Sequence, residues 1–250
     1  MTQTSDREAV LILGGRSDIG QAIAARFAAA GHAVNLAARG AASLEPARAD
    51  MALRHGVPVS AAEFDVLDTA AMAGFVDGLD PEPGIVVCVV GAMGKQAESE
   101  RDLEAAARVM RSNYEGPALI LGLFAERMAA RGRGVIVGVS SVAGDRGRAS
   151  NYVYGSAKAG FTAFLSGLRN RLHGAGVRVI TVKPGFVATR MTEGMDTPTP
   201  LTAQPDEVGR AVLRAVEGRG GDVLYVRPVW RLVMGIIGAL PESVFKKTRL

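Results

Sequence analysis

The sequence predicts an α/β protein in which a doubly wound sheet of about seven parallel strands carries helices on both faces. The first observation is that short apolar runs, typical of buried strands, alternate along the chain with segments of helical periodicity. The second is composition: the chain has 250 residues, 48% hydrophobic and 22% charged, which suits one globular α/β domain. Helical crossovers between consecutive strands make those strands parallel.

The alternation can be followed in order. An apolar strand over residues 9–14 leads through a glycine-rich turn into a helix that stops at Gly31, and a second strand ends at Arg39. The following expected elements are a helix over 43–55, a strand within 57–68, a helix over about 69–79, a strand over 85–91, a long helix over about 100–130, a strand over 135–141, a helix ending near 173–176, a strand from 177, a helix from Pro205 and a strand over 222–226.

The organisation of the chain indicates one domain. Residues 192–204 have no periodicity and several prolines, which is typical of a lid or binding loop. No repeat, low-complexity tract or linker interrupts the pattern. We therefore expect a catalytic domain over residues 1–226, with residues 227–250 as a basic and apolar extension of the same domain.

Composition excludes several classes of protein. The net charge is +4, but the basic residues are scattered until the C-terminus, so nucleic acid is not an expected partner. The single cysteine, Cys88, can form neither an internal disulfide nor a Cys-based zinc site, and its apolar context indicates a buried strand residue; we expect no metal. The polar start over residues 1–9 and the absence of an uncharged apolar run of about 20 residues predict no signal peptide, no membrane span and a cytoplasmic location.

The glycine-rich turn runs from Gly14 to Gly20, between a strand and a helix. Such a turn brings the backbone close to a pyrophosphate, and the helix N-terminus adds free N–H groups. The second strand ends without the acid that selects NAD; Arg39 stands there instead, and Arg16 lies in the turn. Guanidinium pairs well with a 2′-phosphate. These residues predict NADP(H), with NAD(H) as the alternative if Arg39 is only a solvated charge.

A hydroxyl, a phenol and an ammonium follow the strand over 135–141. Tyr154 and Lys158 are four residues apart in a predicted helix and share one face. The ammonium is expected to lower the pKa of the phenol, which makes Tyr154 a candidate general acid. Ser141 ends the preceding strand and can orient a carbonyl oxygen toward that phenol. Two ordinary helix residues remain the alternative for this pair.

Together these motifs resemble the short-chain dehydrogenase/reductase family over nearly the whole chain, with its Rossmann-type fold. The Gly14–Gly20 turn, Asn113, the Tyr154 and Lys158 pair, and the Pro184-Gly185 loop occur in the family's order. The family's spacing selects Ser141 over Ser140 and Tyr154 over Tyr152. The resemblance implies these cofactor-binding residues: Gly14, Arg16, Ser17, Asp18, Ile19, Gly20, Arg39, Asp65, Val66, Gly91, Tyr154, Lys158, Pro184, Gly185, Val187 and Thr189.

The resemblance also implies a mechanism and an assembly. Hydride passes between the nicotinamide and a carbonyl carbon while Tyr154 donates the proton, Ser141 binds the oxygen and Lys158 lowers the tyrosine pKa. Asn113 holds a water that links Lys158 to solvent. The family pairs subunits through the helices near 100–130 and 152–172, so a homodimer or homotetramer is expected.

Two positions depart from the family pattern. Asp18 replaces the middle glycine of the turn, where a carboxylate is unfavourable beside a pyrophosphate unless it points away or caps the helix. Cys88-Val89-Val90 lacks both asparagines that the family has before Gly91. Backbone groups must then replace their hydrogen bonds.

The tail from residue 227 bears on the substrate. It carries Trp230 and other apolar residues between basic ones, Arg227, Arg231, Lys246, Lys247 and Arg249. An apolar segment of this kind can lie on an anionic membrane, and the alternative is a helix packed on the domain or at a subunit interface. The segments SSVAGDRGRASNYVYGSAKAG, VRVITVKPGFVATRM and PESVFKK are similar to the reductase of polyprenylphosphoryl-linked 2-keto-pentoses. This narrower resemblance implies a lipid-linked keto-sugar.

Three functions therefore compete. The first is an NADP(H)-dependent ketoreductase or alcohol dehydrogenase that acts on a small-molecule or lipid-linked carbonyl compound. The second is a soluble 3-oxoacyl-thioester reductase or general alcohol dehydrogenase. The third, a non-catalytic dinucleotide-sensing protein, predicts loss of the serine, tyrosine or lysine, and all three are present.

Overall fold

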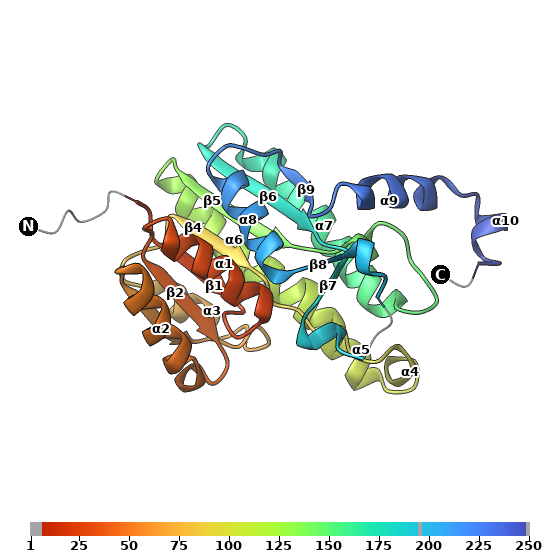
Figure 1. The fold of residues 1–250 in the computed structure, drawn as a ribbon, viewed down its shortest axis with the longest axis horizontal. Helices are drawn as coiled ribbons and strands as arrows, with labels where there is room; N and C mark the ends of the chain where they lie inside the picture. The colour runs from red at the N-terminus through yellow and green to blue at the C-terminus, as the bar shows by residue number, and fades with distance from the viewer. Residues whose placement is uncertain (1–6, 195–196, 249–250) are drawn as a thin grey trace, which may run out of the picture.

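Figure 1 shows the computed structural model of the chain, which describes residues 7–194 and 197–248. One parallel sheet runs through the molecule in the order β3-β2-β1-β4-β5-β6-β9. Its strands are β1 Val10–Leu13, β2 Val34–Ala38, β3 Val59–Glu63, β4 Ile85–Cys88, β5 Gly134–Val139, β6 Val177–Lys183 and β9 Val223–Tyr225. The predicted sheet of seven parallel strands is confirmed.

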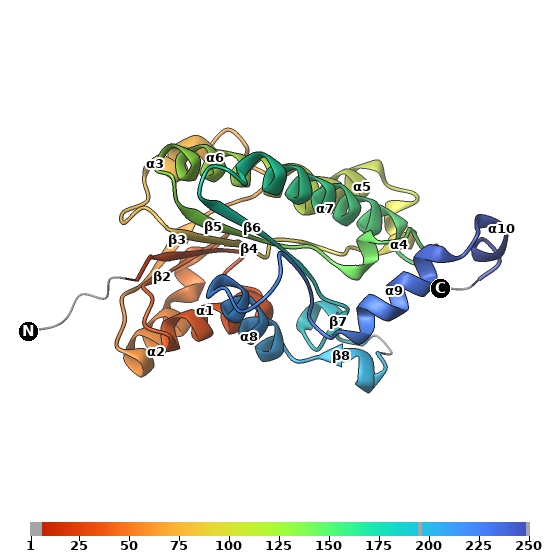
Figure 2. The same cartoon turned by 90° about the horizontal axis from the view of Figure 1, so that it is seen from above.

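Helices cover both faces of the sheet (Figure 2). One layer contains α1 Asp18–Ala29, α2 Glu45–His55 and α8 Pro205–Val216, and the other contains α3 Met72–Asp77, α6 Gly116–Ala130 and α7 Tyr152–Leu172. Side chains of β1 alternate between the two cores. Val10 and Ile12 pack into the first, whereas Leu11 and Leu13 pack into the second. This two-sided burial explains why the strand is apolar at every position.

The strand order reverses at β1, which pairs with β2 on one side and with β4 on the other. The crossovers from these strands therefore leave in opposite directions, and a crevice opens at the carboxyl ends of β1 and β4. The glycine turn follows β1 directly, and Gly91 follows β4. The topology thus brings two of the predicted cofactor segments to one edge of the sheet.

The long helix predicted over about residues 100–130 is present from Leu103 to Ala130, but a π-helical turn lies within it. The structure has α4 Gln96–Ser99, α5 Leu103–Met110, a π-helical turn η2 Arg111–Glu115, and then α6. Pro117 gives the reason, because it has no N–H to donate to the carbonyl of Asn113 and its ring would clash there. The chain widens into a π turn, a feature common at functional sites, and Asn113 lies inside that turn.

Several strands are shorter than predicted, β4 most clearly among them, and the irregular segment over residues 192–204 contains local structure. β4 ends at Cys88 because its neighbour β1 ends at Leu13, the partner of Cys88 in register. In the irregular segment, β8 Thr202–Ala203 pairs with β7 Phe186–Val187. Short 3₁₀ turns complete the fold: η1 Ala41–Leu44, η3 Val142–Gly144, η4 Arg190–Thr192 and η5 Thr199–Leu201. Residues 195–196 of this segment and residues 1–6 of the polar start lie outside the described residues.

The C-terminal extension forms α9 Val229–Ala239 and α10 Glu242–Phe245, which project from the sheet in Figure 2. The expectation of an interfacial Trp230 is wrong: its side chain is 5% exposed, and Nε1 donates a hydrogen bond to the Leu201 carbonyl over 3.0 Å. Arg227 is held by an ion pair with Glu207 at 2.8 Å. Arg249 lies outside the described residues. None of the described helices combines the length and hydrophobicity needed to traverse a bilayer.

Candidate active site

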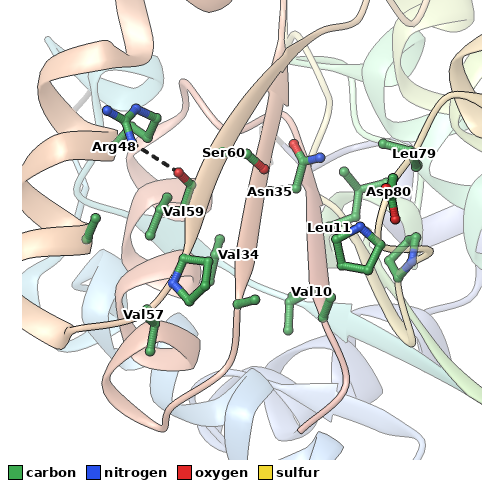
Figure 3. Close-up of a pocket in the computed structure, with 16 residues that line it drawn as sticks. Val10, Leu11, Val34, Asn35, Arg48, Val57, Val59, Ser60, Leu79 and Asp80 are labelled. Carbon is green, nitrogen blue, oxygen red and sulfur yellow. Dashed lines mark hydrogen bonds between the residues drawn. The ribbon is translucent and has the colours of Figure 1, made fainter. Parts of the chain in front are cut away.

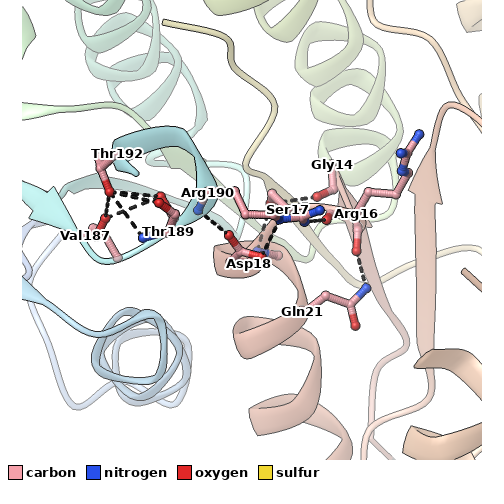
Figure 4. A network of polar contacts seen from close by, with 11 residues as sticks. Gly14, Arg16, Ser17, Asp18, Gln21, Val187, Thr189, Arg190 and Thr192 are labelled. Atoms are coloured by element: carbon pink, nitrogen blue, oxygen red, sulfur yellow. Dashed lines mark hydrogen bonds and ion pairs between the residues drawn. The ribbon is translucent and has the colours of Figure 1, made fainter. Parts of the chain in front are cut away.

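The glycine turn is built around the start of α1 (Figure 4). Ser17 is the N-cap residue: its hydroxyl accepts a hydrogen bond from the Gly20 N–H at 3.0 Å and donates to the Gly14 carbonyl at 2.9 Å. A Cβ on Gly20 would stand 2.5 Å from that carbonyl, and Gly14 has φ +94°. Only glycine fits at these two positions, so the turn keeps its backbone open to a ligand.

Asp18 does not face the turn as an unpaired charge. Its carboxylate accepts hydrogen bonds from the backbone N–H of Arg190 at 2.9 Å and from Arg190 Nε at 3.0 Å. The same guanidinium donates to the Arg16 carbonyl at 2.7 Å (Figure 4). Asp18 therefore joins the glycine turn to the loop after β7, and the paired arginine offsets the repulsion that a carboxylate would exert on a pyrophosphate.

A cleft of about 390 Å³ extends from the glycine turn past the ends of β2 and β3. Five of the residues predicted to bind the cofactor line it: Gly14, Ser17, Asp65, Val66 and Gly91. Four arginines also line it: Arg16, Arg39, Arg108 and Arg190. Their positive charge and the glycine turn fit the phosphates of a dinucleotide.

Within this cleft, Arg16 Nη1 donates to the Arg39 carbonyl at 2.9 Å, so the two predicted phosphate ligands lie side by side. Asp65 accepts a hydrogen bond from the Leu67 N–H at 2.9 Å, which fixes the turn after β3. Sequence reasoning missed Arg108 and Arg190. Arg108 carries no motif, and Arg190 reaches the cleft from 174 residues beyond its contact at Arg16.

A second cavity, which opens beside Gly91, brings together Ser141, Tyr154 and Lys158. Ser141 is the N-cap residue of η3, and its hydroxyl accepts a hydrogen bond from the Ala143 N–H at 3.1 Å. Ser140 also reaches this cavity, but its hydroxyl donates to the Lys158 carbonyl at 3.0 Å and pairs with Thr162 at 2.7 Å. Tyr152 is 46% exposed at the start of α7 and does not line the cavity.

Lys158 is 3% exposed, and its Nζ donates to the Val139 carbonyl at 3.0 Å. Burial lowers the pKa of this ammonium from 10.5 to about 8. Asn113 is fully buried beside it; its Nδ2 donates to the carbonyls of Ala92 and Val109, while its Oδ1 has no hydrogen-bond partner among the described residues. A Cβ on Gly91 would stand 2.6 Å from Asn113 Oδ1 and 3.2 Å from Lys158 Nζ. The two polar atoms thus converge beside Gly91, as a shared water requires.

The pKa of Tyr154 differs from the expectation that Lys158 lowers it. Burial raises the pKa of the phenol, and a hydrogen bond with Ser141 opposes that shift. Lys158 Nζ lies 5.8 Å from the centre of the tyrosine ring and is itself stripped of water. Desolvation disfavours the phenolate, and in the protein alone this effect exceeds that of the Ser141 hydrogen bond.

The loop after β6 forms the far wall of this cavity. Pro184, Gly185, Val187 and Thr189 line it together with Ile19. A Cβ on Gly185 would overlap the Trp230 ring at 2.0 Å, so this glycine lets the C-terminal helix close the wall. Sequence reasoning missed Met191, Thr192 and Trp230, which also line the cavity. Their pattern carries no motif, and only the folded path of the loop and tail brings them here.

Another cavity of about 390 Å³ lies at the amino ends of β1, β2 and β3 (Figure 3). It is lined by Val10, Val34, Val57 and Val59, and by Asn35 on the opposite face of the sheet. None of the predicted site residues borders it, and the glycine turn stands at the other end of the strands. In the described part of the chain, no group of three or more His, Cys, Asp or Glu side chains could hold a metal ion.

The family model for short chain dehydrogenase matches residues 8–199. The chain is 41% identical over 241 residues to an "uncharacterized oxidoreductase" of Mycobacterium tuberculosis, covering 95% of this chain and 96% of the relative. It is 36% identical to another, from Streptomyces coelicolor, over 95% of this chain and 94% of that protein. The chain therefore belongs to the short-chain dehydrogenase family.

Solved structures agree with this assignment. A short-chain dehydrogenase of Sphingobium yanoikuyae in complex with NADPH superposes with a TM-score of 0.81 at 26% identity, covering 95% of this chain and 98% of that one. Actinorhodin polyketide ketoreductase with NADPH gives a TM-score of 0.79 at 26% identity over 90% and 97% of the two chains. The Rossmann-type architecture predicted from the sequence is shared with both.

Proposed function

We propose that this protein is an NADP(H)-dependent oxidoreductase that interconverts a carbonyl compound and the corresponding alcohol. The observation that carries the proposal is the convergence of Ser141, Tyr154 and Lys158 in one cavity next to a glycine turn and an arginine-lined cleft. The NADPH-bound relatives support the choice of cofactor. The third candidate, a dinucleotide sensor, does not account for this arrangement of acid, hydroxyl and ammonium.

The nicotinamide, when bound, supplies or accepts the hydride. Tyr154 gives its proton to the oxygen of the reacting carbonyl, and Ser141 donates a hydrogen bond to the same oxygen as it gains negative charge. Lys158 favours the phenolate that remains after this transfer, because the two side chains lie on one face of α7. Asn113 Oδ1 and Lys158 Nζ hold a water between them, through which a proton returns to the site.

The arginines of the cleft select the phosphorylated cofactor in this proposal. Arg39 directly follows β2, at the position where an acid would bind the ribose 2′-OH of NAD, and Arg16 lies beside it. Arg39 is exposed at the rim of the cleft, where a planar guanidinium can pair with a phosphate in two hydrogen bonds.

The test of function compares Tyr154→Phe with Tyr152→Phe. The first change removes the proposed acid, and we expect turnover of carbonyl substrates to fall at least about 10²- to 10⁴-fold while NADPH binding persists. The second removes a hydroxyl two residues away that lies outside the cavity, and activity should remain. The readout is NADPH absorbance with a panel of ketones and aldehydes. Full activity of Tyr154→Phe would refute the proposed role of this phenol.

Substrate and location are also proposals. The outward side of α9 exposes Leu232 at 66% and Ile236 at 58%, and these residues support contact with a lipid-linked carbonyl compound, such as a keto-sugar, or with a membrane surface at a cytoplasmic face. Co-sedimentation with anionic vesicles should fall when both become Asp. Equal binding of the double variant and the parent would contradict lipid contact through this helix. A 3-oxoacyl-thioester reductase remains the alternative, because the active-site chemistry is the same.

Assembly as a homodimer or homotetramer is the remaining proposal. The outer surface of η2, α6 and α7 exposes Tyr114 at 43% and Leu119 at 49% beside Ala163 and Gly167, which are also exposed. Large apolar groups beside small residues allow close helix packing between subunits. Light scattering of Leu119→Glu should report a smaller particle than the parent, and an unchanged mass would place the interface elsewhere.

A further inference from the structure

The loop between β5 and α7 carries three charged residues in a row of four, and only one lacks a charged partner. Asp145 pairs with Lys183 and accepts a hydrogen bond from the Tyr225 hydroxyl at 2.9 Å. Arg146 pairs with Glu242 at 2.6 Å. Arg148, among the described residues, forms no side-chain hydrogen bond or ion pair, and its Nε is buried. The other two charges hold the loop in place, whereas Arg148 has no such structural role.

Arg148 lines the catalytic cavity together with Ser141 and Tyr154, so its unpaired guanidinium lies at the wall of that cavity. Burial lowers the pKa of its guanidinium, as expected for a cation that has lost water without gaining a counter-charge. Arginine nevertheless stays protonated in proteins. A buried cationic donor left without an acceptor is unfavourable, and an incoming anion removes that penalty.

Asn151 adds a buried acceptor to this unpaired donor. It is the N-cap residue of α7, yet its side chain makes no capping hydrogen bond, and Oδ1 is buried without a partner among the described residues. Asn151 also lines the cavity. An N-cap asparagine normally uses its oxygen to cap the helix, so this oxygen is free for a ligand. The charged residues that line the described cavity are Arg148 and Lys158, both cations, with no carboxylate to neutralise them.

We infer that Arg148 and Asn151 form a recognition subsite for an anionic group of the substrate, so that the enzyme prefers carbonyl compounds that carry a carboxylate or a phosphate ester. Arg148 donates to the anion, and Asn151 Oδ1 accepts a hydrogen bond from a neighbouring hydroxyl of the substrate. The remaining walls, Met93, Phe186, Met191 and Trp230, are apolar and accept the carbon skeleton. This inference deepens the proposed function and rests on it, since it assigns the substrate class of the same site.

The chain contains a single tryptophan, and Trp230 lines this cavity, so its fluorescence reports binding there without any turnover. The full-length protein is titrated, with and without NADP⁺, with acetoacetate, 4-oxopentanoate and 5-oxohexanoate, each against its methyl ester. Dihydroxyacetone phosphate against dihydroxyacetone forms the phosphate arm. We expect at least one anion to bind about 10- to 100-fold more tightly than its neutral partner, the range for a charge-assisted hydrogen-bonded pair.

Three variants make the result specific. Arg148→Leu should abolish the preference for the anion and leave the affinity for the neutral partner within about threefold of that of the parent. Arg148→Lys should retain part of the preference for the anion. Arg54→Leu removes an equal charge from a surface ion pair and should retain all of it. The arm that shows the preference identifies the anion as carboxylate or phosphate.

Equal binding of acids and esters, including undetectable binding of both, would overturn the inference, and so would an Arg148→Leu protein that keeps the preference. Failure of the proposed function is a separate outcome. It would appear as the absence of NADPH turnover with any carbonyl compound, while the fluorescence titration still reports on the subsite.

Discussion

The burial of Lys158 predicts that this residue opposes stability while it serves catalysis. Its pKa falls from 10.5 to about 8 on burial, and each pKa unit corresponds to about 1.36 kcal/mol, so the charged side chain costs about 3 kcal/mol near pH 7. Lys158→Met keeps an unbranched apolar chain and removes the charge. The lost hydrogen bond to the Val139 carbonyl subtracts about 1 kcal/mol. We therefore expect the variant to be about 2 kcal/mol more stable than the parent at pH 7.

The destabilisation caused by Lys158 depends on pH. Below pH 8 the ammonium is charged in the native and unfolded states, and the full penalty applies. Between pH 8 and 10.5 the unfolded chain binds more protons than the native one, so the stability of the parent rises with pH and its difference from Lys158→Met shrinks.

Thermal unfolding at pH 7 and pH 9 measures this effect. At pH 7 the Lys158→Met protein should have a melting temperature about 4 to 8 °C above that of the parent, and this difference should be smaller at pH 9. The variant should have lost turnover at both pH values. Lys246→Met serves as the matched control, because this exposed lysine should change neither stability nor activity. A Lys158→Met protein less stable than the parent at pH 7 would refute the reasoning.

Three further predictions concern the walls of the site. Trp230→Ala removes a buried ring whose centre lies 5.6 Å from that of Phe186, so the variant should lose about 3–5 kcal/mol of stability and have a lower kcat. Leu232→Ala on the exposed side of α9 should lose under about 0.5 kcal/mol, and equal melting temperatures of the two variants would contradict the packing of Trp230. Arg39→Ala should raise the KM for NADPH at least about tenfold and leave the KM for NADH nearly unchanged. An equal rise in both KM values would show that Arg39 does not recognise the 2′-phosphate. Arg190→Ala should weaken NADPH binding, because it leaves the Asp18 carboxylate unpaired beside the phosphates. Adding Asp18→Asn to the same chain should restore part of the lost affinity. Titration calorimetry measures both affinities, and a double variant with no recovery would contradict the proposed repulsion.

The parts of the site that sequence reasoning predicted are those with local causes. The glycine turn requires particular residues at fixed spacing, and Ser17 caps the helix that starts beside it. Tyr154 and Lys158 share a face because residues i and i+4 of an α-helix lie about one turn apart. The π turn within the predicted long helix also had a local signal, since Pro117 cannot donate the regular helical hydrogen bond.

The other parts depend on contacts between distant segments. Asp18 pairs with Arg190, 172 residues further along the chain, and this pair explains how a carboxylate is tolerated in the glycine turn. No sequence pattern around either residue predicts the other as its partner. Trp230 has the sequence context of a membrane-surface residue, but Gly185 leaves a space that its ring fills. The pKa of Tyr154 depends on burial, which raises it, and on the hydrogen bond with Ser141, which lowers it, and the sequence does not reveal how deeply the phenol is buried.

The unfavourable features of this fold gather at the proposed active site. In the described residues, the buried side-chain atoms without a hydrogen-bond partner are Asn35 Oδ1, Asn113 Oδ1, Arg148 Nε and Asn151 Oδ1. Three of the four belong to residues beside the catalytic cavity, as does the buried ammonium of Lys158. A sequence selected for stability alone would pair or replace these groups, as it does almost everywhere else in the described core. Their concentration around Tyr154 indicates that water, cofactor and substrate complete these hydrogen bonds when the site is filled.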